Sequence, residues 1–187
     1  MGTPGASARQ VELLDAAYRY VLANGLGDLS LRPLAAAVGS SPRVLLFLFG
    51  SKDGLVRALL ARARADELEL LGGIRTSGGL AEIAREVWAW LAAPEHRALL
   101  TLWTEAYARS LVEPDGAWSG FARDTVRDWL TLLAEAQSPE ERETPAGAAR
   151  RTSVLAVLRG ALLDLLATSD EERTTAAVEE ALRPLSP

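Results

Sequence analysis

The residues best placed for chemistry lie at the start of a short predicted helix, where Arg43 follows Ser41 and Pro42. Ser41 can cap this helix, and Pro42 suits its first position because the φ angle of proline is already helical. An arginine here can bond the edge of a guanine through two parallel hydrogen bonds. Val44 or Pro42 could contact a thymine methyl group. The alternative for Arg43 is an ordinary solvated charge at a helix start.

Two more cations flank this helix. Arg32 and Lys52, the single lysine of the chain, are placed for DNA phosphates, which fix the register of a protein on DNA but carry no sequence information. Lys52 could instead be a first-turn residue without a partner. The complete set of predicted DNA-contacting residues is Arg32, Ser40, Ser41, Pro42, Arg43, Val44, Phe47 and Lys52.

The element that must position these side chains is a pair of short helices. Ser30 can cap the first helix with its hydroxyl group, and Pro33 falls where a missing N–H costs little. The apolar face of this helix is formed by Leu31, Leu34, Ala35 and Val38. Gly39 follows, where a helix end favours a left-handed residue. This pattern predicts a helix-turn-helix, whose second helix enters the major groove of DNA.

A supporting helix is predicted before this pair, over residues 8–24, after a loose arm at residues 1–7. Its inner face is expected to comprise Leu14, Ala17, Tyr18 and Val21. A longer helix, over residues 52–71, should link the pair to the remainder of the chain.

Three segments in register resemble the N-terminal domain of TetR-family transcriptional regulators: LLDAAYRYVLANG, LSLRPLAAAVGSS and PRVLLFLFGSKDGLVRALL. The resemblance covers residues 11–60. It implies an all-α fold of about nine helices, with a helix-turn-helix DNA-binding domain at residues 1–52 and a helical ligand-binding and dimerisation domain at residues 53–187. It also implies a homodimeric regulator, usually a repressor, that binds a pseudo-palindromic operator in double-stranded DNA.

The end of the recognition helix departs from the family pattern. Family members usually carry tyrosine there, often with histidine, and these groups bond DNA phosphates. Phe47 occupies the tyrosine position without a donor, while Leu45, Phe49 and one of Leu46 or Leu48 should face the core. We therefore expect fewer phosphate contacts. The alternative function is a ligand-binding or scaffolding dimer that has lost specific DNA binding.

Charge is distributed unevenly along the 187 residues, whose net charge is −5. Residues 1–65 carry eight basic and four acidic residues, a net charge of +4, whereas the remainder carries −9. This distribution suits a polyanion at one end of the molecule, although solvated charges can segregate by chance. No apolar run reaches the length of a membrane span or a secretory signal, so we expect a cytoplasmic protein.

Catalytic and metal-binding chemistry has little support in the sequence. The chain has no cysteine, which excludes disulfides and Cys-ligated metals. His96 is the single histidine and is expected to be a solvated surface residue. No nucleophile motif such as Gly-x-Ser-x-Gly is present. We therefore expect no enzyme activity, no metal and no cofactor.

The second part of the chain contains all five tryptophans. Helices are predicted over residues 80–92, 95–112, 118–137, 148–168 and 170–183, with a mobile loop at residues 138–147. Aromatic side chains usually fill a core, but by the family resemblance this region holds a pocket for a small apolar or aromatic ligand. The candidate pocket residues are Trp88, Leu91, Trp103, Tyr107, Phe121 and Trp129.

The stretch VLAVLRGALLDLLA, residues 154–167, is apolar on almost every side and must be covered. It resembles the penultimate helix of the family, which packs with the last helix against a second copy. The candidate dimer-interface residues are Val154, Ala156, Val157, Gly160, Ala161 and Asp164. The alternative is a helix inside the core of one protomer.

Overall fold

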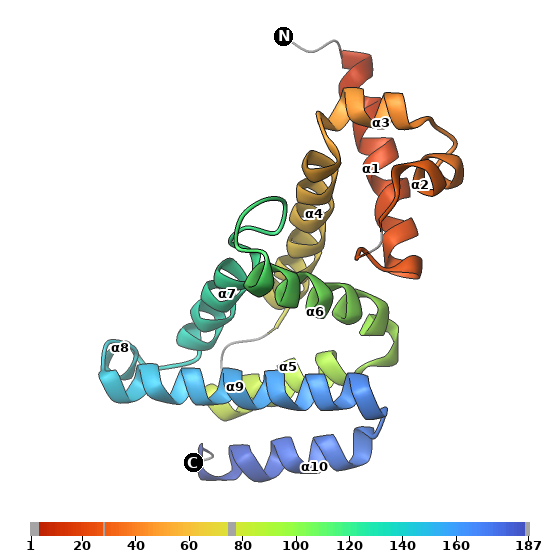
Figure 1. The fold of residues 1–187 in the computed structure, drawn as a ribbon. Helices are drawn as coiled ribbons and strands as arrows, with labels where there is room; N and C mark the ends of the chain where they lie inside the picture. The colour runs from red at the N-terminus through yellow and green to blue at the C-terminus, as the bar shows by residue number, and fades with distance from the viewer. Residues whose placement is uncertain (1–3, 28, 75–77, 186–187) are drawn as a thin grey trace. The chain divides into compact units, whose positions relative to one another are not determined.

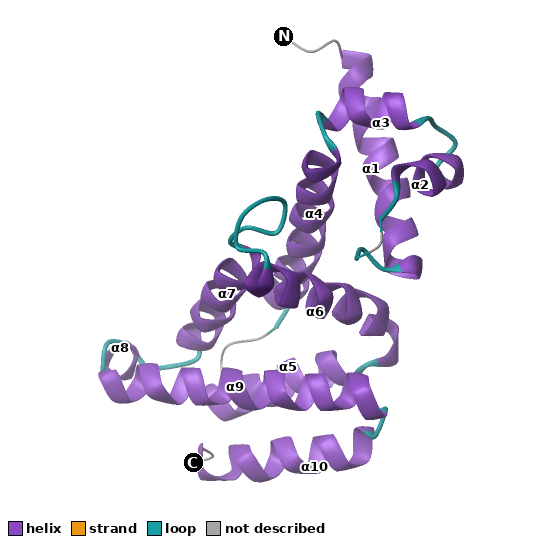
Figure 2. Cartoon of the chain, viewed as in Figure 1, coloured by secondary structure: helices purple, strands orange, loops and turns teal. Residues whose placement is uncertain are grey.

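The computed structural model describes residues 4–27, 29–74 and 78–185, without the side chains of residues 4–7, 70 and 71. Ten α-helices and two short 3-10 helices make up this part of the chain, which contains no strand (Figures 1 and 2). The helices are α1 (Pro4–Asn24), α2 (Leu31–Ala37), α3 (Pro42–Phe49), α4 (Lys52–Gly72), α5 (Leu80–Ala92), η1 (Pro94–His96), α6 (Arg97–Val112), α7 (Phe121–Glu135), α8 (Pro139–Arg142), α9 (Pro145–Thr168), α10 (Glu171–Leu182) and η2 (Arg183–Leu185). The all-α prediction is confirmed.

The chain forms two compact units that are not divided at a single point in the sequence. The head unit comprises Met1–Asp66 and Thr101–Ala122, and the body unit comprises Glu67–Leu100 and Arg123–Pro187. Helices α4 and α6 therefore contribute residues to both units. The functional boundary at residue 52 remains a proposal.

Helices α1, α2 and α3 pack together in the head unit (Figure 1). The buried face of α1 contains Ala17, Tyr18 and Val21 as predicted, but Leu13 takes the buried position that we expected for Leu14. Helix α1 begins at Pro4, so the expectation of a loose arm is wrong for residues 4–7, and residues 1–3 lie outside the described part.

The start of α2 differs from the prediction, whereas its end agrees with it. Ser30 occupies the N-cap position of α2, but its side chain makes no capping hydrogen bond, so that prediction is wrong. The Ser30 carbonyl oxygen accepts the Leu34 N–H at 3.2 Å and begins the helix through the backbone. Gly39 has a φ of +63° and ends the α2 turn in the left-handed conformation, as predicted.

Helices α5, α9 and α10 pack against one another in the body unit (Figure 1). Their core includes Val87 and Leu158, which are at most 1% exposed, together with Leu133 of α7. Two polar contacts hold α10 in place. The Trp88 indole donates to Thr175 Oγ1 at 2.9 Å, and both carboxylate oxygens of Asp164 accept hydrogen bonds from the guanidinium group of Arg173, at 2.7 and 2.8 Å.

The segment at residues 138–147 is helical at both ends, so the expected mobile loop is wrong. Ser138 caps α8 by accepting the Glu141 N–H at 3.2 Å. Thr144 caps α9 by accepting the Gly147 N–H at 2.9 Å. The prolines in this segment stand in the first turns of α8 and α9, where their missing N–H groups cost nothing.

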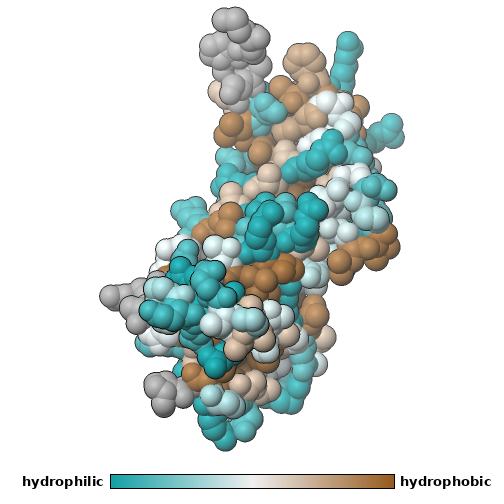
Figure 3. Space-filling model, turned by 90° about the vertical axis from the view of Figure 1, so that its left-hand side faces the viewer, coloured by the Kyte–Doolittle hydropathy of each residue, from teal (hydrophilic) through white to brown (hydrophobic). Residues whose placement is uncertain are grey.

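None of the helices in the described residues combines the length and apolar character that crossing a membrane requires. The face drawn in Figure 3 carries hydrophilic and hydrophobic groups in separate patches.

Candidate functional site

The recognition helix α3 begins as the sequence predicts. Ser41 has extended backbone angles, and its hydroxyl oxygen accepts the Val44 N–H at 3.3 Å. Pro42 stands in the first turn. These two residues fix the start of the helix, which sets the direction of the Arg43 side chain.

Helix α3 has one buried anchor and one exposed face. Leu45 is fully buried, whereas Phe49 and Leu48 are half-buried and Leu46 is exposed. Of the alternatives for the inward-facing leucine, the structure therefore favours Leu48. Phe47 is 81% exposed.

Neighbouring helices hold the C-terminal end of α3 in the head unit. Gln10 of α1 donates from its side-chain amide to the Leu48 carbonyl oxygen at 3.0 Å. At the start of α4, a Cβ atom added to Gly54 would overlap the Phe49 carbonyl oxygen, so only glycine allows this close approach. The Gly54 N–H donates to Ser51 Oγ at 2.9 Å. The recognition helix is therefore fixed against α1 and α4.

The predicted DNA-contacting residues are exposed or half-buried, and three of them line one groove. Arg32, Ser41, Arg43, Val44, Phe47 and Lys52 are exposed, and Ser40 and Pro42 are half-buried. A surface groove of about 590 Å³ is lined by Arg32, Pro42 and Lys52 together with Gly27, Leu29, Ser30 and Leu31. The groove thus brings together the two cations that we assigned to phosphates.

The cations of this surface are not neutralised by any described residue of the protein. Among the described residues, neither Arg32, Arg43 nor Lys52 forms a hydrogen bond or ion pair through its side chain. Most other arginines of the head unit do have acceptors. Arg62, for example, bonds Asp15 at 2.8 Å and Asp66 at 2.9 Å. Three exposed positive charges are therefore available to an external anion.

Helix α6 contacts the turn between α1 and α2, within the head unit. The buried Leu26 donates its N–H to the Glu105 carboxylate at 3.0 Å, and Arg109 reaches the Gly27 carbonyl oxygen at 3.5 Å. Glu105 could not be identified from the sequence as the partner of Leu26, because the two residues lie 79 positions apart. The only local signal is the glycines at 25 and 27, which allow close approach of another group.

Burial raises the pKa of Tyr18, and the neighbouring Asp66 carboxylate raises it further. The Tyr18 ring lies under the Arg62 guanidinium, 5.7 Å from its centroid. The same Asp66 raises the pKa of Arg62 through its hydrogen bond. Both groups keep their protons at neutral pH, so this cluster is a structural link between α1 and α4.

The candidate pocket residues fall into both units. Trp88, Leu91 and Trp129 are buried in the body unit, whereas Trp103, Tyr107 and Phe121 belong to the head unit. Trp103 and Tyr107 share a helix face as predicted, since their rings stack with centroids 5.1 Å apart. That the six residues form one pocket remains a prediction.

A buried carboxyl group accompanies these aromatic side chains. Trp129 donates from its indole N–H to Glu67 Oε1 at 2.6 Å, and both residues are 4% exposed. Glu67 is not among the candidate pocket residues predicted from the sequence. The available signal was its spacing, because Leu60, Ala63 and Glu67 recur on one face of α4.

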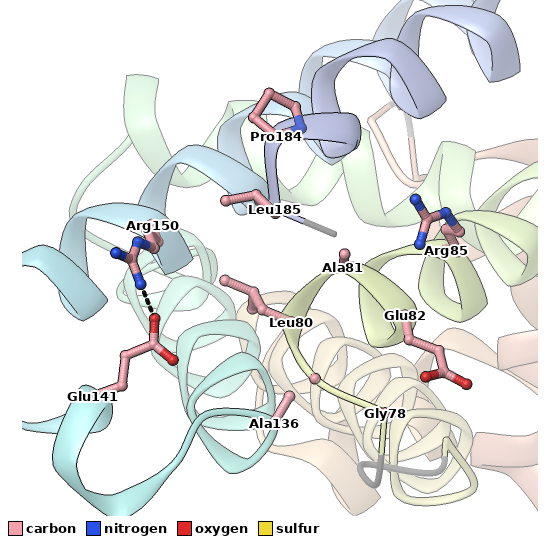
Figure 4. A pocket seen from close by; sticks show the side chains of 11 residues that line it. Gly78, Leu80, Ala81, Glu82, Arg85, Ala136, Glu141, Arg150, Pro184 and Leu185 are labelled. Atoms are coloured by element: carbon pink, nitrogen blue, oxygen red, sulfur yellow. Dashed lines mark hydrogen bonds and ion pairs between the residues drawn. The ribbon is translucent and has the colours of Figure 1, made fainter. Parts of the chain in front are cut away.

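A different cavity of about 640 Å³ opens on the body unit (Figure 4). None of the candidate pocket residues lines it. Its walls include Leu80 and Arg85 of α5, Ala136, Leu185, and the ion pair between Glu141 and Arg150. Arg85 also pairs with Glu179 at 2.9 Å, so Arg85, Glu141 and Arg150 all have partners within the protein.

His96 is not a solvated residue, contrary to the expectation. Its ring stacks on Trp90 with centroids 4.2 Å apart, and its Nδ1 atom lies 2.8 Å from the Trp90 carbonyl oxygen. Since a carbonyl can only accept, Nδ1 carries the proton. No group of three or more potential metal ligands occurs among the described residues.

The candidate dimer residues are only partly on the surface of α9. Ala156 and Gly160 are exposed, Val157, Ala161 and Asp164 are intermediate, and Val154 is 1% exposed. Val154 therefore packs inside its own protomer. Leu163, which is 53% exposed, and Ala167 extend the outward face.

A capped recognition helix, fixed by two neighbouring helices and flanked by unpaired cations, defines a helix-turn-helix protein. Residues 13–59 match the family model described as bacterial regulatory proteins, tetR family. By this match, residues 13–59 form the DNA-binding region of a TetR-family transcriptional regulator.

The relatives agree with this assignment. The HTH-type transcriptional regulator BetI of Brucella anthropi is 30% identical over 133 residues, which is 71% of this chain and 57% of BetI. The chain thus matches little more than half of the length of this curated relative.

Solved structures share the fold along almost the whole chain. A structure of the multidrug binding protein EbrR complexed with proflavin is 25% identical, with a TM-score of 0.69, and the match covers 94% of this chain and 98% of that one. A transcriptional regulator from Rhodococcus sp. Rha1 is 19% identical, with a TM-score of 0.73 and coverage of 92% and 93%.

Proposed function

We propose that this protein is a homodimeric, ligand-responsive transcriptional regulator that represses genes by binding a pseudo-palindromic operator. The observation that carries the proposal is the exposed face of α3, where Arg43, Arg32 and Lys52 have no partner within the described residues. Arg43 reads a guanine, and the two flanking cations contact phosphates. Such binding would place the protein in the cytoplasm.

Two heads are required to read two half-sites, about 34 Å apart for one helical turn or a multiple of that distance. The outward face of α9 supports a dimer, because Ala156 and Gly160 allow a second backbone to approach closely, and Leu163 offers an exposed apolar side chain. The bidentate pair of Asp164 and Arg173 holds α10 beside this face. A two-fold dimer contact through α9 and α10 fits these features.

The ligand is proposed to be a small apolar or aromatic molecule held by the tryptophans of the candidate pocket. EbrR, which is similar in fold and 25% identical, has been solved with proflavin. In this chain, the buried Glu67 carboxyl group next to Trp129 would favour an aromatic ligand that carries a positive charge. A ligand shifts the protein between states only by its differential affinity for them, and a shift from 1:99 to 99:1 needs roughly 5.5 kcal/mol.

The Glu105 contact offers a route from the ligand to the head. Glu105 lies on α6, which contributes residues to both units, and it holds the turn that precedes α2. A ligand that moves α6 would therefore change the position of the recognition helix.

The test is a selection of random duplexes on the purified protein, followed by affinity measurements on the enriched sequence. We expect a palindrome whose half-sites are spaced by whole helical turns, and affinity that falls steeply with added salt. Arg43→Ala should relax the preference at one base pair by about 1–3 kcal/mol, and Lys52→Ala should reduce the salt slope by about 1.

The matched control is Arg123→Ala, which removes the same charge from an exposed position of the body unit. It should leave the preference unchanged. If no sequence is enriched, the rival function, a ligand-binding or scaffolding dimer without specific DNA binding, is favoured. The absence of a tyrosine at position 47 is the observation that keeps this rival in consideration.

A further inference from the structure

The exposed side of the recognition helix is apolar as well as cationic. Phe47 is 81% exposed and Val44 is 39% exposed. They stand three residues apart, and Arg43 stands four residues before Phe47, so the three side chains share one face of α3. This face therefore offers an aromatic ring and a branched methyl group next to a guanidinium group.

The backbone that carries Phe47 is held in place. Its neighbour Leu48 receives the hydrogen bond from Gln10, and the following Phe49 carbonyl group packs directly on Gly54. The ring itself is not folded back onto the protein, since four-fifths of it faces outward. Its position relative to a bound partner is thus set by the fold of the head unit.

The charges around this face decide between possible partners. Arg32, Arg43 and Lys52 are exposed and have no ion pair among the described residues, which favours a polyanion over an apolar protein surface. The apolar groups that a DNA duplex presents in its major groove are the C5-methyl groups of thymine. The face lies on the helix proposed to enter the major groove, which makes that groove its fitting occupant.

We propose that Phe47, with Val44, reads the C5-methyl groups of pyrimidines in each half-site. The inference rests on the proposed DNA-binding function and specifies its sequence chemistry. Phe47 and Val44 are separated by about 4.5 Å along the helix axis, so a helix lying in the major groove can present them to methyl groups on different base pairs. Unlike the tyrosine that is usual at this position in the family, Phe47 has no hydroxyl group to bond a phosphate. We therefore assign its ring to the methyl groups of the bases.

The test compares duplexes that differ only in methyl groups. The enriched operator is synthesised with deoxyuridine in place of thymine at one position at a time, and binding is measured by fluorescence anisotropy at fixed salt. Each methyl group that is read should weaken binding about fourfold when removed, as expected for losing one buried methyl-sized group. At the same position, 5-methylcytosine should bind about fourfold better than cytosine, which separates the methyl group from the rest of thymine.

Variants assign the effect to a side chain. Phe47→Ala should abolish the discrimination between thymine and deoxyuridine at one position, whereas Phe47→Tyr, which keeps the ring, should retain it. The matched control is Leu46→Ala, which truncates the adjacent, 39% exposed side chain and should also retain it. Because Phe47 is exposed, Phe47→Ala should fold normally, which circular dichroism checks.

Several results would overturn the inference. Equal binding of thymine and deoxyuridine duplexes by the natural protein refutes methyl reading while leaving DNA binding intact. If both Phe47→Ala and Val44→Ala still bind thymine duplexes more tightly than deoxyuridine duplexes, other residues read the methyl groups. A change in sedimentation mass in Phe47→Ala, without a change in discrimination, makes this face a contact between copies of the chain. Failure to bind any duplex refutes the inference together with the proposed function.

Discussion

The contact between Glu105 and the Leu26 N–H gives the sharpest prediction about the head unit. Leu26 is 1% exposed, and its N–H donates to the Glu105 carboxylate at 3.0 Å. The same carboxylate lies against Gly27, where an added Cβ atom would overlap it. Glu105→Ala removes the acceptor and leaves a buried donor without a partner.

The magnitude follows from the chemistry of the bond. A hydrogen bond to a charged group contributes about 1.5–3 kcal/mol, and a buried donor left unsatisfied costs a similar amount. We therefore expect Glu105→Ala to lower the local free energy of opening at Leu26 by about 2 kcal/mol. Since about 1.4 kcal/mol corresponds to a factor of ten, the Leu26 amide should exchange with solvent roughly 30-fold faster. Glu105→Gln keeps an acceptor but loses the charge, so its effect should be about half as large in free energy.

The assay is amide hydrogen exchange of the full chain, read at Leu26 by NMR. The matched control is Glu113→Ala, which removes a carboxylate of the head unit that pairs with Arg109 at 2.9 Å on the surface. An exposed pair of this kind contributes only about 0.3–0.5 kcal/mol, so exchange at Leu26 should change by about twofold or less. Unchanged exchange in Glu105→Ala would refute the assignment of Glu105 as the group that holds this turn.

Two further predictions concern other contacts. Gly54→Ala should destabilise the head unit by about 1–3 kcal/mol in thermal unfolding, because the added Cβ atom meets the Phe49 carbonyl oxygen. The control is Gly72→Ala on the same helix, whose added Cβ atom meets open space, so this variant should be neutral or stabilising. Equal stability of the two variants would argue against the close approach at Gly54. The hydrogen bonds from Arg173 lower the pKa of Asp164, so this group stabilises the fold above the ordinary aspartate pKa of about 3.9, and the stabilisation disappears as the pH falls through the lowered value. Asp164→Asn should therefore lower Tm at pH 7, and the difference from the natural protein should shrink as the pH falls through the lowered pKa. A difference that does not shrink in acid would contradict the pairing.

The recognition helix could be predicted from sequence because its signals are local. Ser41, Pro42 and Gly39 each act on residues within one helical turn, and all three have the predicted conformations. Ser138 and Thr144 carry the same local signal, because each is a capping residue followed by a proline in the first turn of a helix. A serine or threonine followed by proline is also typical of loops, and the sequence alone favoured a loop here. Helix α8 was missed for that reason.

Other features depend on partners that are distant in the sequence. Glu67 is buried because Trp129 supplies a hydrogen bond from a residue 62 positions away, and Val154 faces inward because its apolar helix packs inside the protomer. Periodicity indicates that α9 must be covered but does not distinguish a neighbouring helix from a second copy of the chain. Ser30 shows the opposite case, in which a suitable capping residue leaves its hydroxyl unused.

The discontinuous head unit has a consequence for how the protein is made. Its first segment ends at Asp66, but its remaining segment, which supplies Glu105, ends at Ala122. On a ribosome that adds about 5–20 residues per second, the nascent helix-turn-helix waits roughly 3–11 s before its last segment has been synthesised. Until Glu105 has been synthesised, the turn at Leu26 lacks its acceptor. A single cut after residue 66 would leave the same incomplete unit, so transplanting this head onto another protein requires two splice points.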